Sequence, residues 1–273
     1  MAETGRRYTA DVVIIGGGLA GLVTAYELLD LNKKVLILER DSQEKLGGLA
    51  KDSFGGIMMV DTPLQRKNGI KKSPELALAD WMSYARFDED ALWPKAWAKH
   101  YVTRSRDIIH DWLAKRNVTF LPVVNWPERG LYVPGNSVPR WHIAWGTGYG
   151  IIEAILADLD AHPLIKNLTS HCGHRVEGLD VTDGAVTGCH GVLEGTNTEF
   201  RAEGKAVVAA AGGMCGGDLS MVRANWYKPW GPPPKILLNG SHPYADGTVH
   251  RAIETAGGNR SEERRVGKEC RSR

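Results

Sequence analysis

Residues 11 to 40 read DVVIIGGGLAGLVTAYELLDLNKKVLILER, and this stretch decides the fold of the chain. Its opening, Asp11 to Ile15, is rich in β-branched residues, as expected of a strand that is buried on both faces. A glycine-rich turn comes next, followed by a helical stretch from Leu19 to Leu31 and a polar turn at residues 32 to 34. Val35 to Leu38 is a second apolar strand. The stretch therefore predicts a complete strand–turn–helix–strand unit.

The turn Gly16-Gly17-Gly18-Leu19-Ala20-Gly21 fits the dinucleotide-binding pattern G-x-G-x-x-G. Gly16 allows a tight turn, Gly18 lets the backbone approach a pyrophosphate, and Gly21 lets the helix pack closely on the strand. The phosphates would then contact the first amides of the helix, at Leu19 and Ala20. Glu39 ends the second strand, at the distance after Gly21 that the pattern requires, and is placed to accept hydrogen bonds from ribose hydroxyls.

A cleavable signal peptide is the alternative for this region, because Arg6-Arg7 precedes the apolar stretch from Val12 to Ala25. Asp11 interrupts that pattern, three glycines lie at its centre, and it leaves the position of Glu39 unexplained. No other apolar stretch approaches the roughly 18 residues that a membrane span requires. We therefore expect a soluble protein with no membrane span.

The carboxyl-terminal segment, Arg260 to Arg273, is highly charged and has no apolar periodicity. It can be encoded by a DNA sequence that resembles a common short-read sequencing adapter read in the antisense direction. A solvated basic tail that binds an acidic partner is the alternative. The adapter explains every residue whereas the tail explains only the charge, so we expect the native sequence to stop at about Asn259.

Excluding this segment changes the charge of the chain. It holds six of the 34 basic and three of the 32 acidic residues, so 28 and 29 remain and the formal net charge falls from +2 to −1. This balance gives no indication of nucleic acid or an anionic membrane as a partner.

The cysteines that remain, Cys172, Cys189 and Cys215, are too few and too scattered for a disulfide framework. A reducing, cytoplasmic location is the default for such a chain. His171-Cys172-x-His174 lacks a second ligand pair at a zinc-like spacing, so we expect ordinary strand or turn residues and no metal.

The rest of the chain indicates one large α/β unit. Ser73-Pro74-Glu75 has the composition of a helix start, with Ser as the N-cap and Pro at the first helical position. The further expected elements are helices over residues 94–115 and 148–160, a hairpin from Val176 to Val192 around Asp183-Gly184, a strand approached at Phe200, and a strand over residues 205–211 that ends on Gly212-Gly213.

Three features point beyond a simple dinucleotide fold: the glycine pairs at 47–48 and 55–56, the hairpin before the alanine-rich strand, and Gly212-Gly213 at the end of that strand. With them, the chain from Asp11 to Gly258 resembles the flavoprotein family of fumarate reductase flavoprotein subunits and 3-ketosteroid Δ1-dehydrogenases. It resembles most the FAD-binding dehydrogenases related to the ketosteroid enzymes. The specific stretches are Ser53-Phe54-Gly55-Gly56, Asp61 to Arg66, Gly69-Ile70-Lys71, Trp126 to Gly130, Gly135 to Arg140 and Gly146-Thr147-Gly148.

This resemblance implies a Rossmann-like FAD-binding domain with a parallel sheet and a β-hairpin excursion, followed by the start of a capping domain. It implies that Glu39 and Arg40 contact the adenosine ribose region and that Val176 brackets the adenine. The implied FAD-binding residues are Gly16, Gly18, Leu19, Ala20, Gly21, Glu39, Arg40, Gly47, Gly48, Ala50, Ser53, Gly55, Gly56, Val176, Ala210 and Gly212. Some relatives carry a histidine in the second glycine loop that links covalently to the flavin. Leu49-Ala50 stands there in this chain, so we expect non-covalent FAD.

The implied activity is a dehydrogenation across a C–C bond next to a carbonyl, in which a base removes the α proton and the flavin accepts a hydride from the β carbon. A steroid ketone or similar small molecule is the implied substrate, and an electron acceptor is the second partner. Arg140 and His142 are candidates for the substrate pocket. A surface arginine and a packed histidine are the alternative interpretation.

These implications divide the chain into an incomplete FAD-binding domain over 1–213, the start of a capping or substrate domain over 214–259, and the adapter segment over 260–273. Three other functions stay open: a fumarate reductase-like flavoprotein, an NAD-linked dehydrogenase, and an incomplete flavin-domain fragment without activity. An NAD-linked enzyme would share the fingerprint but should lack the glycine pair at Gly47-Gly48.

Overall fold

The computed structural model describes residues 5–70, 73–121, 135–226 and 228–258. The predicted family stretch from Trp126 to Gly130, Lys71, and the predicted adapter segment fall outside these ranges. The described chain forms two compact units by its internal contacts, one made of residues 1–49 and 159–273 and the other of residues 50–158.

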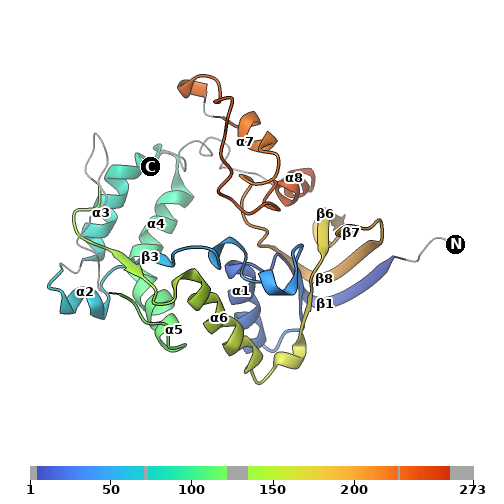
Figure 1. Ribbon diagram of the computed structural model, residues 1–273, viewed down its shortest axis with the longest axis horizontal. Coiled ribbons are helices and arrows are strands. Elements are labelled where there is room, and N and C mark those ends of the chain that lie inside the picture. Colours follow the sequence, from blue (N-terminus) through green and yellow to red (C-terminus); the bar gives the residue numbers. More distant parts are fainter. Residues whose placement is uncertain (1–4, 71–72, 122–134, 227, 259–273) are drawn as a thin grey trace. The chain divides into compact units, whose positions relative to one another are not determined.

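The first unit is built on a six-stranded sheet in the order β5-β2-β1-β8-β7-β6. The first four strands in this order, β5, β2, β1 and β8, are parallel to one another. β7 and β6 continue the sheet in antiparallel fashion. Figure 1 shows β1 and β8 side by side, with β6 and β7 beyond them. The strands are β1 (Arg6–Ile15), β2 (Val35–Leu38), β5 (Leu168–His171), β6 (His174–Thr182), β7 (Ala185–Leu193) and β8 (Glu199–Ala209).

This topology confirms the predicted Rossmann-like parallel sheet with a hairpin excursion. Helix α1 (Leu19–Asp30) connects β1 to the parallel strand β2, as expected of a βαβ unit. The hairpin turns at Asp183 and Gly184, whose φ angles of 50° and 78° suit a type I′ turn. The described part of this unit also contains the α-helices α7 (Ser220–Ala224) and α8 (Thr248–Thr255).

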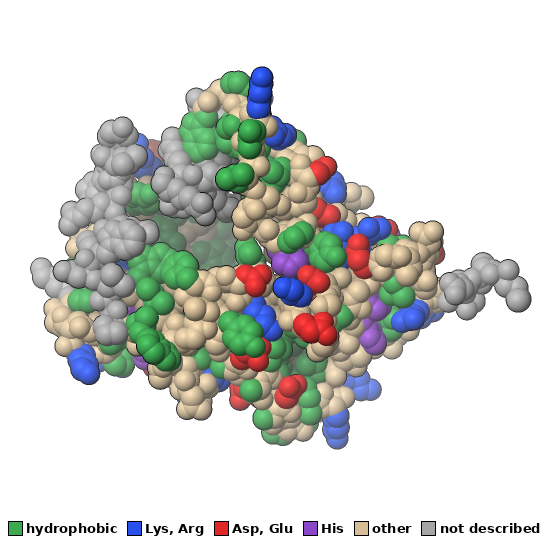
Figure 2. Space-filling model, viewed as in Figure 1, with side chains coloured by type: hydrophobic (Ala, Val, Ile, Leu, Met, Phe, Trp, Pro, Cys, Tyr) green, Lys and Arg blue, Asp and Glu red, His purple; other side chains and the backbone are tan. Residues whose placement is uncertain are grey.

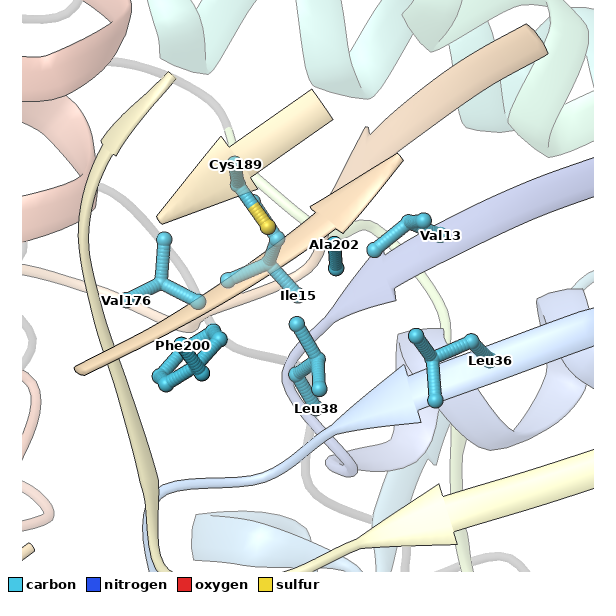
Figure 3. Close-up of a cluster of buried hydrophobic side chains, with 8 residues drawn as sticks. All are labelled: Val13, Ile15, Leu36, Leu38, Val176, Cys189, Phe200 and Ala202. Atoms are coloured by element: carbon cyan, nitrogen blue, oxygen red, sulfur yellow. The ribbon is translucent and has the colours of Figure 1, made fainter. Parts of the chain in front are cut away.

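The core of this sheet is a cluster of buried side chains on one of its faces (Figure 3). Val13 and Ile15 are two positions apart on β1 and therefore point to the same face, where the equally spaced Leu36 and Leu38 of β2 join them. The other members are Val176, Cys189, Phe200 and Ala202. The hairpin therefore belongs to the same core as the dinucleotide-binding unit.

The second unit is mainly helical and carries the two-stranded antiparallel sheet of β3 (Gly56–Met58) and β4 (Trp141–Ile143). Its helices are α2 (Pro63–Lys67), α3 (Pro74–Ala85), α4 (Leu92–Ser105) and α5 (Asp111–Ala114), with most of α6 (Thr147–Asp160). The predicted start of α3 is confirmed, because the Ser73 hydroxyl accepts a hydrogen bond from the Leu76 amide at 3.1 Å.

Three expectations need correction. The helix predicted over 94–115 begins at Leu92, and a π-helical turn over Arg106–His110 separates α4 from α5. Strand β1 begins at Arg6, because the residues from Arg6 to Ala10 pair with β8. Phe200 and residues 205–209 belong to one continuous strand, β8, which ends at Ala209.

Candidate functional site

The carboxyl ends of three parallel strands bring the predicted site residues of the first unit together. Ile15 of β1 is aligned with Leu38 of β2 and with Ala209 of β8. Hydrogen bonds from the Gly16 amide to Leu38 O and from the Ala210 amide to Ile15 O, both 2.8 Å, hold the segments that follow. This edge of an open parallel sheet is where α/β proteins bind their ligands.

The three glycines of the pattern have different surroundings. Gly16 has a φ of 108°, and a Cβ there would lie 2.8 Å from the Ala210 carbonyl carbon. A Cβ at Gly21 would collide with the Gly16 carbonyl oxygen, which is the close helix–strand packing expected from the sequence. A Cβ at Gly18 would have Gly47 O, at 4.0 Å, as its nearest neighbour. Two of the glycines are therefore required by the fold, whereas Gly18 faces open space.

The start of α1 fits a pyrophosphate. Gly18 is the N-cap of this 12-residue helix, no side chain caps it, and its first turn contains no acidic residue. Helix N-termini favour anions because their first amides lack intrahelical acceptors and lie at the positive end of the helix dipole. Leu19 and Ala20 are the first two residues of this turn, as the sequence predicts.

The second glycine pair lies against the first turn. Gly47 and Gly48 have φ angles of 105° and 55°, which favour glycine. The Gly47 amide donates a 2.8 Å hydrogen bond to Gly17 O, and Gly18 and Gly47 form a parallel β-bridge. Two segments that are separated in the sequence by α1 and β2 thus form one glycine-lined surface beside α1.

Glu39 and Arg40 differ in what they contact. The Glu39 carboxylate accepts hydrogen bonds from the Gly17 amide at 2.6 Å and from the Asp41 amide at 2.7 Å. The Arg40 guanidinium forms 2.9 Å ion pairs with Glu194 and Asp246. Burial opposes the charged form of Arg40, but hydrogen bonds to both carboxylates raise its pKa.

Arg40 also lies over the Tyr244 ring, 4.4 Å from its centroid. Figure 2 shows acidic, basic and histidine side chains gathered near α8 and β6 on the face of the molecule that is in view. The family resemblance predicts a contact between Arg40 and the adenosine ribose region. The structure shows that two of its donor groups, Nε and one terminal nitrogen, are engaged by carboxylates. It therefore connects the end of β2 to the loop before α8.

Val176 and Gly212 complete the predicted set in this unit. Val176 is buried, and its side chain packs in the cluster of Figure 3, so a contact with adenine would come from its backbone. Gly212 has a φ of 76°, and nothing lies within 4 Å of the position that its Cβ would take. Ala210 precedes it at the end of β8.

The second unit holds the predicted loop residues Ala50, Ser53, Gly55 and Gly56. The Ser53 hydroxyl donates to Ala50 O at 2.8 Å and accepts from the Gly55 amide at 3.2 Å, so the loop is bonded internally. It is also bonded to the start of α6: the Gly148 amide donates to Ser53 O, and the Ala144 amide donates to Gly55 O, both at 2.9 Å.

Two residues without an assigned role prove to shape these loops. A Cβ at Gly148 would collide with Ala50 O and with the Ser53 hydroxyl. A Cβ at Gly17, the variable position of G-x-G, would lie 2.5 Å from a methyl carbon of Leu46. The sequence signal for Gly148 was the stretch Gly146-Thr147-Gly148, but its contact with the loop depends on tertiary structure.

Arg140 and His142 are both buried in the second unit. Arg140 forms a 2.7 Å ion pair with Asp80 and donates to the Asn136 side chain at 2.8 Å. Arg140, Asp80 and Asn136 line a pocket of about 170 Å³ together with Met58, Ala77, Trp81 and Tyr84. Its small volume, and the carboxylate that already neutralises Arg140, favour a structural role for this arginine.

His142 is inaccessible to solvent. Its Nε2 lies 2.7 Å from the Thr62 hydroxyl, and its Nδ1 lies 2.9 Å from Arg140 O. Burial lowers its pKa to about 4, and the nearby His110 contributes in the same direction. Both ring nitrogens are occupied, which favours the packed-histidine interpretation.

His171 and His174 lie at the end of β5 and the start of β6, as predicted for strand or turn residues. Their rings stack at 5.3 Å, and His174 Nε2 lies 2.9 Å from the Tyr8 hydroxyl. Among the residues that the structure describes, no group of three or more His, Cys, Asp or Glu side chains is arranged to hold a metal ion. The same described part of the chain contains no helix with the length and apolar character of a membrane span.

Comparisons with known proteins agree with this fold. A family model for an FAD binding domain matches residues 11–266. The chain is 41% identical over 268 residues to a KsdD-like steroid dehydrogenase of Mycobacterium tuberculosis, a match that covers 91% of this chain and 46% of the relative. The chain thus spans less than half of that relative's length.

Two solved structures share the fold. A 3-ketosteroid-Δ4-(5α)-dehydrogenase of Rhodococcus jostii, solved with 4-androstene-3,17-dione, superposes with a TM-score of 0.71 at 23% identity, covering 94% of this chain and 56% of that one. The open conformation of a flavocytochrome c3 fumarate reductase superposes with a TM-score of 0.74 at 20% identity, covering 91% and 40%.

Proposed function

Because the chain belongs to the family of FAD binding domains, we propose that it is the FAD-binding part of a dehydrogenase that removes hydrogen across a C–C bond next to a carbonyl. FAD is the cofactor of this family. The NAD-linked dehydrogenase that the sequence left open is therefore set aside. The observation that carries the proposed activity is the 41% identity to a KsdD-like steroid dehydrogenase over nearly the whole chain. A 3-ketosteroid or a similar ketone is the proposed substrate.

The residues of this chain would bind and orient the cofactor. The amides at the start of α1 and the open space at Gly18 would receive the pyrophosphate. Glu39 retains acceptor capacity for ribose hydroxyls, because each carboxylate oxygen can accept more than one hydrogen bond. The further proposed contacts are those of Gly16, Leu19, Ala20, Gly21, Arg40, Gly47, Gly48, Ala50, Ser53, Gly55, Gly56, Val176, Ala210 and Gly212.

FAD, when bound, supplies the two-electron oxidant for the dehydrogenation, and a separate electron acceptor would reoxidise it. Leu49-Ala50 replaces the histidine that some relatives carry, which supports non-covalent attachment. Because Arg140 and His142 are buried and engaged with other groups, we place the catalytic acid or base in the portion of the full protein that corresponds to the unmatched half of its relatives.

Fumarate reduction is the second candidate, supported by the similarity in fold to a flavocytochrome c3 fumarate reductase. The test uses the full-length protein and two assays: oxidation of a 3-ketosteroid with an artificial electron acceptor, and oxidation of a reduced dye by fumarate. Steroid turnover without fumarate turnover supports the proposal. Fumarate turnover alone replaces it, and a flavin-loaded protein inactive in both assays contradicts the proposed substrates while leaving FAD binding intact.

The division into domains over 1–213 and 214–259 is part of the same proposal, as is the adapter origin of residues 260–273. Sequencing of the unamplified locus across the Asn259 codon tests the latter. Different codons after that position support the adapter, and the same codons overturn it. A cytoplasmic location is also proposed, because Cys172, Cys189 and Cys215 are too few and too scattered in the sequence for a disulfide framework.

A further inference from the structure

The peptide groups of Gly17 are held from two sides. Its amide donates a 2.6 Å hydrogen bond to Glu39 Oε2, and its carbonyl oxygen accepts a 2.8 Å hydrogen bond from the Gly47 amide. Gly17 lies between Gly16, which makes the turn, and Gly18, which faces the open space beside α1. These two hydrogen bonds therefore fix the orientation of the peptide groups on both sides of Gly17.

Glu39 is itself fixed in place. Its second carboxylate oxygen accepts a 2.7 Å hydrogen bond from the Asp41 amide. Its backbone amide donates to His171 O at 2.9 Å, and its carbonyl oxygen accepts from the His174 amide at 2.8 Å. The carboxylate that holds Gly17 is thus attached to three strands of the sheet through β2, β5 and β6.

The space around Gly17 matches this arrangement. A Cβ at this position would lie 3.1 Å from Glu39 Oε2 and 2.5 Å from a methyl carbon of Leu46. Leu46 is buried and cannot move aside freely. The pattern G-x-G accepts any residue at its second position, but in this chain the side chains of Glu39 and Leu46 fill the space and favour glycine.

We infer that Glu39 is a positioning residue for the pyrophosphate, which acts by holding the Gly17 amide, in addition to its proposed contact with the ribose. A hydrogen bond from an amide to a carboxylate is stronger than one between neutral groups. A turn that is already ordered avoids the entropy cost of becoming ordered when the ligand binds. The inference depends on dinucleotide binding by the family fold and is independent of the proposed reaction.

The test is a cycle that combines one substitution with one change in the ligand. ADP and 2′,3′-dideoxy-ADP share the pyrophosphate, but the second lacks the ribose hydroxyls. Their dissociation constants are measured by calorimetry with the flavin-free full-length protein and its Glu39→Ala variant. If Glu39 holds the turn, the variant should bind dideoxy-ADP about tenfold or more weakly than the wild type does. Equal affinities of the two proteins for dideoxy-ADP would overturn the inference.

A matched control distinguishes this effect from general damage to the sheet. Asp11 Oδ2 accepts a 2.9 Å hydrogen bond from the amide of Lys34, the residue directly before the start of β2. Asp11→Ala removes this amide–carboxylate contact and an exposed 3.0 Å ion pair with Lys205, both away from the glycine turn. It should leave the affinity for both nucleotides unchanged, and a loss equal to that of Glu39→Ala would count against a specific role for Glu39.

A second measurement needs no ligand. In the wild type, the Gly17 and Asp41 amides should exchange slowly with deuterium because both donate to Glu39. Glu39→Gln offers a single acceptor oxygen, so at least one of the two amides should exchange faster, and in Glu39→Ala both should. Unchanged exchange at Gly17 in Glu39→Ala would overturn the inference even if the variant binds nucleotides poorly.

Discussion

At the scale of single residues, the surroundings of Gly18 and Gly21 differ in a way that a binding experiment can detect. Gly18→Val places a branched side chain in space that the fold leaves open, so it should remove FAD binding while the melting temperature of the flavin-free protein changes little. Gly21→Val collides with the Gly16 carbonyl oxygen, so it should lower that melting temperature as well. Flavin content and thermal melting of both variants are the measurements, and unchanged flavin content in Gly18→Val would refute the assigned site.

His142 gives a second prediction, on pH. Its pKa is about 4 in the folded protein, because burial disfavours the charged ring, and about 6.5 when the chain unfolds. Between these values the unfolded state binds more protons, so the free energy of unfolding should fall as the pH falls from 6.5 to 4. At pH 5 this histidine should account for a loss of about 2 kcal/mol relative to pH 7.

The measurement is urea unfolding of the wild type and of His142→Gln at both pH values. The variant should be less stable at pH 7, because it disturbs the contact with Thr62, but it should lose less stability on acidification. Burial also lowers the pKa of His174, so some pH dependence should remain in the variant. Parallel stability profiles of the two proteins would contradict the assignment to His142.

At the scale of elements, the Asp80–Arg140 pair connects α3 to the segment that enters β4. Asp80 also accepts hydrogen bonds from the Ser137 amide and hydroxyl, at 2.8 and 2.7 Å. Burial raises the pKa of Asp80, but the bonds from Ser137 and Arg140 outweigh it and the net shift is downward. This carboxylate is therefore a charged group that the second unit depends on.

Asp80→Ala should lower the free energy of unfolding by about 3 kcal/mol, because it leaves the buried Arg140 without its counter-ion. Adding Arg140→Met should recover part of that loss, since an apolar side chain of similar length needs no partner. Chemical denaturation of the single and double variants measures both effects. Asp107→Ala, which breaks an exposed ion pair with Arg104, is the control and should change stability little.

Elements with local signals were predictable from the sequence, and elements that depend on distant partners were not. Ser73 and the Asp183-Gly184 turn carry their signal in adjacent residues, and the structure confirms both. The first half of β1 is mostly polar and forms a strand because it pairs with β8, which comes much later in the chain. No local pattern could show that pairing.

The same distinction holds in the candidate site. The turn at Gly16 and the close packing at Gly21 could be predicted from their spacing, because the turn and the helix start are local, whereas the pyrophosphate contact of Gly18 stays a proposal. The partners of Arg40 are 154 and 206 residues away, so its two ion pairs could not be predicted. The contact between Glu39 and Gly17 could be derived only from the fold, because it requires β1 and β2 to end side by side.

At the scale of the whole molecule, the chain has both the glycine-lined surface beside α1 and large exposed apolar side chains. Trp93 and Trp97 of α4 are 72% and 68% exposed in the second unit. Leu238 is 93% exposed in the first unit. Trp93 and Trp97 are four residues apart on α4 and therefore lie next to each other on one face of the helix. Adjacent exposed aromatic side chains are typical of surface that contacts another protein segment. We therefore expect the isolated chain to be poorly soluble.

The last prediction compares this chain with its full-length protein. The residues proposed to bind the pyrophosphate and ribose are present, whereas the match covers 46% of the KsdD-like relative. Groups that orient the substrate and exclude water contribute strongly to catalysis. We propose that these groups lie in the part of the relative that the match does not cover, so this chain should be inactive even with its cofactor bound. The oxidised-flavin spectrum and steroid oxidation should be measured for both proteins. We expect turnover by the full-length protein only. If the shorter chain holds stoichiometric FAD and turns over, the active site lies within it and the proposed position of the catalytic groups is wrong.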